Sequence, residues 1–232
     1  MGTSNLSLAF NASSIANLIY FSSFNTFYPT LHIIFFLSQT IYYVHQEKER
    51  PCVKNAKTAL IIIDMLNDFQ FKNGKILAEK SLTIAQNISK LKQYASSQHI
   101  PIIYVNDHYK LWQANLETIL THCTNEISSP ILHHISPQNA DYFLIKPKHS
   151  IFYGTALNIL LSQLDVHTLI LTGIAGNICV LFSANDAYMR EYNLIVPEDC
   201  IASNADEDNT FALRMMHNVL NARICKHTEL MN

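Results

Sequence analysis

The chain has 232 residues, and 16 basic against 18 acidic residues give it a formal net charge of −2. This length suits one α/β domain, or one domain with an appendage. The lack of a basic excess argues against a protein that binds nucleic acids through their phosphates. Five cysteines without a CxxC pair exclude a zinc ribbon, and their odd number argues against a disulfide framework, so we expect reduced thiols and a cytoplasmic protein.

The N-terminal segment differs from the rest of the chain in composition. Residues 1–46 contain no Asp, Glu, Lys or Arg and are rich in aromatic side chains, and the first charged residue is Glu47. A transmembrane anchor needs about 20 mostly apolar residues, whereas the best apolar run here, 30–44, is shorter and is interrupted by polar residues. A secretory signal needs basic residues before its apolar run, and none precede it here. Membrane contact through 1–46 is therefore a secondary interpretation.

Another interpretation of this segment concerns where translation begins. Val53 lies just before a strong first strand, and the native chain would begin there if its codon is the true start. We therefore divide the chain into an uncharged, aromatic-rich extension at 1–52 and one domain at 53–232. The extension is expected to be disordered, to be a structured addition, or to be absent from the native protein because the start is wrongly assigned.

Beyond this segment, strand and helix patterns alternate along the chain. The run 58–63 is continuously apolar and rich in β-branched residues, which is typical of a strand buried on both faces of a parallel sheet. Such alternation predicts βαβ units with right-handed crossovers. In chain order we predict a strand at 58–63, a helix at 81–96, a strand at 101–105, a helix at 111–123, a strand at 141–145, a helix at 155–164, a strand at 168–172, a helix at 178–192, a strand at 194–196, a helix at 209–222 and a short strand at 223–226.

A cysteine follows the fourth predicted strand, at the edge of the sheet where sites of open α/β folds lie. Cys179 falls in the first turn of the next predicted helix, where the helix dipole should lower the pKa of a thiol. Gly173 and Gly176 precede it and would allow the backbone to approach a ligand closely. The alternative is an inert cysteine buried between helix and sheet.

An acid and a cation end two other predicted strands. Asp64 ends the first strand, where poor solvation would raise its proton affinity and suit it to act as a general base. Its alternative role is to cap the following loop. Lys146 ends the third strand. A lysine that lies between the acid and the cysteine would stabilise the thiolate form of the cysteine. Its alternative is a solvated loop lysine, with Lys148 as a rival for the same role.

Three segments that contain these residues, 64–69, 146–155 and 171–180, resemble the isochorismatase-like cysteine hydrolases. That superfamily includes nicotinamidases, N-carbamoylsarcosine amidase and ureidoacrylate hydrolases. The resemblance covers about residues 57 to 226. It implies a three-layer α/β/α, Rossmann-like fold with a six-stranded parallel sheet. It also implies a catalytic triad of Asp64, Lys146 and Cys179.

The resemblance carries further expectations about mechanism. It implies a cis peptide bond between Ile174 and Ala175, and an oxyanion hole formed by the N–H groups of Ala175 and Cys179. The implied activity is hydrolysis of a C–N bond in a small amide or ureide, through a thioester on the cysteine. The implied assembly is a homo-oligomer, and the implied partner is a small-molecule substrate.

The sequence departs from nicotinamidases after the second predicted strand. Those enzymes carry an Asp-x-His element and a further His for a metal ion, whereas Asp107 and His108 are adjacent here. We therefore expect no metal and no cofactor, and nicotinamide is a doubtful substrate. Phe69, Trp112 and Tyr153 are candidates for lining the substrate pocket, although Trp112 could equally belong to the hydrophobic core.

Two other functions compete with amide hydrolysis. Enzymes that hydrolyse the vinyl ether of isochorismate resemble this chain but lack the nucleophilic cysteine, so the presence of Cys179 favours C–N hydrolysis. The other alternative is a non-catalytic member of the fold that binds a ligand.

Overall fold

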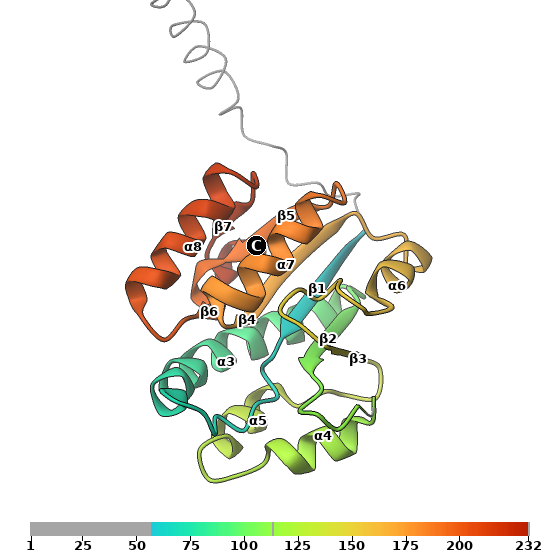
Figure 1. Ribbon diagram of the computed structural model, residues 1–232. Helices are drawn as coiled ribbons and strands as arrows, with labels where there is room; N and C mark the ends of the chain where they lie inside the picture. Colours follow the sequence, from blue (N-terminus) through green and yellow to red (C-terminus); the bar gives the residue numbers. More distant parts are fainter. Residues whose placement is uncertain (1–56, 113, 232) are drawn as a thin grey trace, which may run out of the picture. The chain divides into compact units, whose positions relative to one another are not determined.

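A computed structural model describes residues 57–112 and 114–231 of the chain (Figure 1). The expectations for the extension at 1–52 fall outside these residues. Within the two described ranges, no helix has the length and apolar character needed to cross a membrane.

A parallel β-sheet forms the centre of the domain (Figure 1). Six strands follow one another in the order β3-β2-β1-β4-β5-β7, and every pair is parallel, which confirms the predicted sheet. A seventh strand of two residues, β6, pairs with the end of β4 and was not expected from the sequence. The strands are β1 (Thr58–Ile63), β2 (Ile102–Asp107), β3 (Tyr142–Lys146), β4 (Thr168–Ile174), β5 (Asn193–Pro197), β6 (Ile201–Ala202) and β7 (Arg223–Cys225).

Helices cover both faces of the sheet and complete the predicted three layers (Figure 1). Helices α3, α4 and α5 pack against one face, and α6, α7 and α8 pack against the other. The helical segments are α3 (Gly74–Ser97), α4 (Leu116–Cys123), α5 (Ser129–Ile135), α6 (Leu157–Gln163), the π-helical turn η1 (Gly176–Val180), α7 (Leu181–Tyr188), the short 3₁₀ turn η2 (Glu198–Cys200), α8 (Asp206–Asn218) and a second 3₁₀ turn, η3 (His227–Leu230).

Strand β1 shows how the sequence produces these layers. Its side chains alternate between the two faces, as the period of a strand requires. Leu60 and Ile62 belong to the hydrophobic cluster on the α3 side, whereas Ile61 and Ile63 belong to the cluster on the α7 side. All four are fully buried. A run that is apolar at every position is therefore required here, because both faces of this strand are covered.

The main errors of the sequence prediction are at helix starts. The helix predicted at 111–123 begins at Leu116, because the side chain of Asn115 accepts a hydrogen bond from the N–H of Thr118 and caps it. The loop before it contains left-handed residues, among them Tyr109 and Trp112, which a helix excludes. Helix α5 was not predicted, and the helix expected at 178–192 begins at Gly176 as a π-helical turn.

Candidate active site

The predicted acid, cation and thiol come together at the carboxyl edge of the sheet. Asp64 directly follows β1, Lys146 is the last residue of β3, and Cys179 lies in η1 after β4. The Nζ atom of Lys146 lies 2.7 Å from Oδ2 of Asp64 and 3.6 Å from Sγ of Cys179. The strands that carry Asp64 and Lys146 are not adjacent, because β2 lies between them. The long lysine side chain bridges this gap, whereas Lys148 is exposed.

The Asp64 carboxylate is held from two sides. Its Oδ2 pairs with Lys146, and its Oδ1 accepts a hydrogen bond of 2.9 Å from the N–H of Asp107 at the end of β2. The sequence did not point to this contact, because it involves a backbone group.

Asn106 fixes the loop that follows Asp64. Its buried side chain accepts from the N–H of Leu66 at 3.1 Å and donates to the carbonyl of Leu66 at 2.8 Å. Sequence reasoning missed this role, although a polar residue that ends an apolar strand is a signal for it. Through Asn106 and Asp107, β2 thus positions Asp64 and the loop that follows β1.

Burial and the ion pair act on the pKa values of this group in opposite directions. Burial raises the pKa of the Asp64 carboxyl above its ordinary value of 3.8, while the charge of Lys146 partly opposes that rise. Burial lowers the pKa of Lys146, but its neighbours, above all the negative charge of Asp64, outweigh burial and raise that pKa overall. Lys146 therefore stays protonated. The Asp64 carboxylate next to it has a higher proton affinity than an aspartate in water.

The thiol does not have the lowered pKa that its place after a strand suggested. Burial first, and then the neighbouring Asp64 carboxylate, raise the pKa of the Cys179 thiol, and Lys146 offsets only part of this. The five-residue π-helical turn replaces the regular first turn on which the expectation rested. The thiol is therefore neutral near pH 7 and needs a base to become a nucleophile.

The glycine-containing turn before Cys179 is packed against the protein itself. The peptide bond between Ile174 and Ala175 is cis. Gly173 has a φ of 111°, and a Cβ there would clash with the carbonyl oxygen of Ile63 in β1. A Cβ on Gly176 would clash with the side chain of Asn209 in α8. Gly173 thus allows close packing of β4 against β1, and Gly176 allows close packing of η1 against α8, where the sequence predicted a close approach to a ligand.

The three candidate pocket residues have different surroundings. Phe69 is buried in the hydrophobic cluster on the α3 side, and Tyr153 is exposed. The side chain of Trp112 is 68% exposed and stacks on His108, with 4.1 Å between ring centroids, so it is not part of the core. Their contribution to a substrate pocket stays a prediction.

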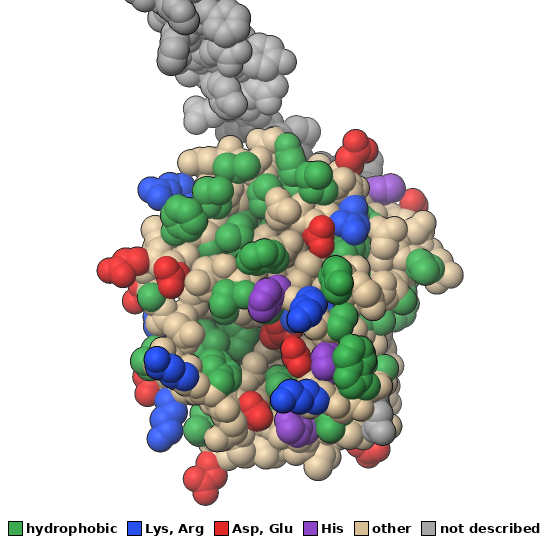
Figure 2. All heavy atoms as spheres, in the orientation of Figure 1, with side chains coloured by type: hydrophobic (Ala, Val, Ile, Leu, Met, Phe, Trp, Pro, Cys, Tyr) green, Lys and Arg blue, Asp and Glu red, His purple; other side chains and the backbone are tan. Residues whose placement is uncertain are grey.

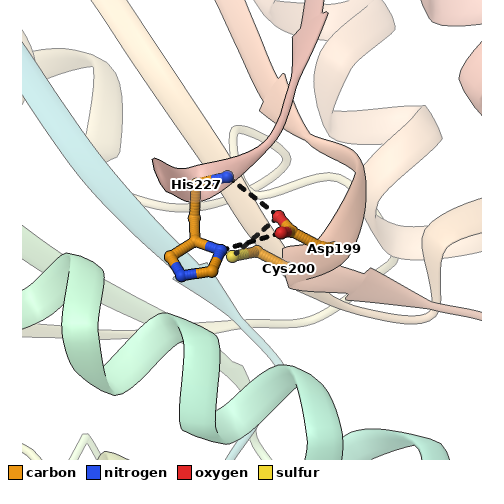
Figure 3. A group of neighbouring side chains, drawn as sticks. All are labelled: Asp199, Cys200 and His227. Atoms are coloured by element: carbon orange, nitrogen blue, oxygen red, sulfur yellow. Dashed lines mark hydrogen bonds and ion pairs between the residues drawn. The ribbon is translucent and has the colours of Figure 1, made fainter. Parts of the chain in front are cut away.

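A second group of reactive side chains lies at the ends of β5 and β7 (Figure 3). Asp199, Cys200 and His227 place their potential metal-ligating atoms within 4.8 Å of one another. Figure 3 shows the Asp199 carboxylate facing His227, whose N–H and Nδ1 lie 2.9 Å and 2.7 Å from its two oxygens. The imidazole Nε2 is buried and has no hydrogen-bond partner among the described residues. Because both Asp199 oxygens are engaged by His227, we interpret the group as an anchor for the C-terminal segment.

The outer surface of α7 and α8 carries exposed hydrophobic side chains, which gather in the upper part of the face drawn in Figure 2. They include Phe182, Met189, Phe211 and Val219. Charged and histidine side chains lie below them on the same face (Figure 2).

Comparisons with known proteins agree with the fold and with the motifs. The family model described as the isochorismatase domain matches residues 58–228. The uncharacterized isochorismatase family protein YaaI of Bacillus subtilis is 57% identical over 178 residues, which are 77% of this chain and 98% of that protein. The structure of pyrazinamidase/nicotinamidase from Streptococcus mutans matches with a TM-score of 0.58 and 30% identity, over 72% of this chain and 99% of that one. N-carbamoylsarcosine amidase from Thermoplasma acidophilum matches with a TM-score of 0.57 and 26% identity, over 74% and 96%.

Proposed function

Because the chain belongs to the isochorismatase family of hydrolases, we propose that it hydrolyses the C–N bond of a small amide or ureide with Cys179 as nucleophile. The observation that carries this proposal is the contact of one buried ammonium with both an acid and a thiol. Lys146 lies 2.7 Å from Asp64 and 3.6 Å from Cys179. A neutral thiol beside a carboxylate of raised pKa is the combination that general-base activation requires.

In the acylation half of the reaction, the thiol proton moves to the Asp64 carboxylate as the sulfur attacks the substrate carbonyl carbon. The charge on Lys146 stabilises the anionic sulfur before the S–C bond forms. The N–H groups of Ala175 and Cys179 hold the oxyanion of the tetrahedral intermediate. Asp64 then returns its proton to the leaving nitrogen, the C–N bond breaks, and a thioester remains on Cys179.

In the second half, Asp64 takes a proton from a water molecule, whose oxygen attacks the thioester carbon. The C–S bond breaks, the acid is released, and the proton returns to the sulfur. Two solved relatives, a pyrazinamidase/nicotinamidase and an N-carbamoylsarcosine amidase, support an amide or ureide as the substrate class.

Ammonia release from a panel of small amides and ureides tests the proposal. The panel includes nicotinamide and N-carbamoylsarcosine, and the full chain is compared with its Cys179→Ala variant. We expect release by the wild type and none above background by the variant. Equal turnover by both proteins would remove the thiol from the mechanism.

The same two proteins separate the competing functions. A vinyl-ether hydrolase would release pyruvate from isochorismate, and Cys179→Ala would keep that activity. A ligand-binding member of the fold would release neither product.

The proposal also includes a homo-oligomer, which the exposed hydrophobic side chains on α7 and α8 support. Light scattering after size-exclusion chromatography measures the mass of this oligomer.

A further inference from the structure

A histidine lies next to the thiol, in addition to the acid and the lysine. Nδ1 of His149 is 3.8 Å from Sγ of Cys179, within the range of hydrogen bonds that involve sulfur. His149 is exposed, whereas Asp64 is buried. The sulfur therefore has one acid–base group in the protein interior and another in contact with solvent.

The segment that carries His149 is fixed at both ends. Lys146, three residues earlier, ends β3 and is held by Asp64. Ser150, the next residue, donates a hydrogen bond to Asp186 of α7, and the N–H of Ile151 donates to Ser183 of α7 at 3.1 Å. An imidazole between two such anchors has little freedom to leave the sulfur.

The ring of Phe182 gives the imidazole a further contact. The two ring centroids are 5.6 Å apart, with an interplanar angle of 50°. Phe182 follows Cys179 by three residues, so the thiol and this ring lie on the same side of the helical segment. The packing alone would explain an aromatic residue at position 149, but not the direction of Nδ1 toward sulfur.

Asp64 is poorly placed to handle every proton of the reaction. Both of its oxygens already accept hydrogen bonds, one from Lys146 and one from the backbone of Asp107, and these contacts favour its ionised form. It is also enclosed on the interior side of the sulfur. A leaving nitrogen that departs toward solvent is more accessible to a group on the exposed side.

We propose that His149 is a second acid–base residue, in addition to Asp64, that acts on the thiol of Cys179. In a route parallel to the one through Asp64, its neutral imidazole accepts the thiol proton through Nδ1 while the sulfur attacks the carbonyl carbon. The same proton then passes from Nδ1 to the leaving nitrogen as the C–N bond breaks, so His149 ends neutral. This catalytic step rests on the proposed function, whereas the proton transfer from the thiol does not.

The charged groups on the elements around His149 set the conditions for this step. Lys148 is its neighbour in the loop, and Lys146 and Asp64 lie at the other contacts of the thiol. On α7, Asp186 pairs with Arg190 at 3.1 Å and accepts from Ser150. A protonated imidazole has no free nitrogen to accept the thiol proton, so only a neutral His149 can take part in this step.

Alkylation of Cys179 by iodoacetamide tests the proposal without any substrate. The rate is followed from about pH 5 to 9 by the mass of the peptide that contains Cys179. His149→Phe keeps an aromatic ring against Phe182 and removes both nitrogens, and His149→Gln removes the ring. His133→Gln, at an exposed position on α5, is the matched control.

In the wild type and in His133→Gln we expect the rate to rise across this pH range, as groups that can take the thiol proton lose their own protons. At the upper end of that range we expect both His149 variants to react about tenfold more slowly, less than the 10²–10⁴ typical of a sole general base because Asp64 remains. Profiles that superimpose on the wild type would overturn the proposal. A loss in His149→Gln alone would also overturn it, because packing would then be the cause.

These results are independent of the proposed hydrolysis. If the wild type hydrolyses an amide while alkylation of the His149 variants is normal, the inference fails and the function stands. If alkylation slows in both variants while no amide is hydrolysed, the acid–base pair stands and the proposed function fails.

Discussion

The domain contains two thiols that lie next to a carboxylate, and they differ in what surrounds them. Cys179 adjoins Asp64 after β4 and β1, and Cys200 adjoins Asp199 after β5. Burial and the neighbouring carboxylate raise the pKa of both thiols. Cys200 is fully buried, however, whereas Cys179 is only partly buried.

The partner of each carboxylate is the second difference. Asp64 pairs with Lys146, whose ammonium also contacts the sulfur of Cys179. Asp199 pairs through both oxygens with His227, which leaves the sulfur of Cys200 at 3.8 Å from one of them. A cysteine beside an aspartate therefore does not define a site in this fold. In our proposal, the site is marked instead by an accessible sulfur that shares a cation with the acid.

The test with the largest expected effect removes each of the two thiols in turn. We expect Cys179→Ala to lower kcat by at least about 10⁴-fold, because the nucleophile is lost. Cys200→Ala should keep kcat within about threefold and lose on the order of 1 kcal/mol of stability, as a buried side chain becomes smaller. Ammonia release and urea unfolding measure both effects. A Cys200→Ala protein that folds normally but has no activity would contradict the comparison.

The second test removes the cation from the active group. Lys146→Met should lower kcat/KM by about 10²-fold, because one buried electrostatic contact to the reacting group is lost. Without the lysine, the effect of burial on Asp64 loses its main opposing interaction, so the pKa of the Asp64 carboxyl rises further. Since the ionised carboxylate is the base, the acidic limb of the pH profile should move to higher pH.

Lys92→Met is the matched control for that variant. Lys92 is also buried and pairs with an aspartate, Asp141, at 3.2 Å, and it also donates to a backbone carbonyl. Its loss should reduce stability and leave the acidic limb in place. Equal shifts of the limb in both variants would show that the effect comes from the overall charge of the protein.

The residue pattern predicted the architecture, and the resemblance to a known family implied which three residues come together. The run 58–63 and the later alternation of strands and helices predicted the parallel sheet, because burial on both faces leaves a continuous apolar pattern. The position of Asp64, Lys146 and Cys179 at strand ends predicted their shared edge of the sheet.

The surroundings of these residues could not be predicted in the same way. The N–H of Asp107 that bonds Asp64 is a backbone group, which every residue carries, so no side chain marks it. The pKa of Cys179 depends on burial and on a carboxylate from another strand, whereas the helix dipole was the only local signal. The contact of His149 with sulfur likewise depends on a loop that α7 holds in place.

The third test removes His227, which pairs with the Asp199 carboxylate in the second group. His227→Gln should lower the free energy of unfolding by about 1–3 kcal/mol, because the buried side of Asp199 loses its hydrogen bond. The value of kcat/KM should stay unchanged. In the matched control His167→Gln, an exposed histidine paired with Asp165 at 3.1 Å is lost, and we expect a much smaller change because solvent screens this pair. A large loss of activity in folded His227→Gln would give the second group a part in catalysis.

The smallest expected effect is on the stability of the protein at alkaline pH. It concerns Cys225, which ends β7 and lies beside Cys200 of the second group. Burial raises the pKa of this thiol to about 11, from an ordinary value of 9.0. Above pH 9 the unfolded chain loses this proton while the folded chain keeps it, so the folded state binds more protons and stability falls as the pH rises.

Cys225→Ala should remove this contribution. The fall in the free energy of unfolding between about pH 9 and 10 should then be smaller than in the wild type by about 1 kcal/mol. Below pH 9 the two proteins should differ by a constant amount, which is the cost of the smaller side chain. Urea unfolding at each pH measures the difference. Parallel curves through the whole range would mean that the pKa of this thiol is the same in the folded and unfolded protein, and the second group would then be more open to solvent than its burial implies.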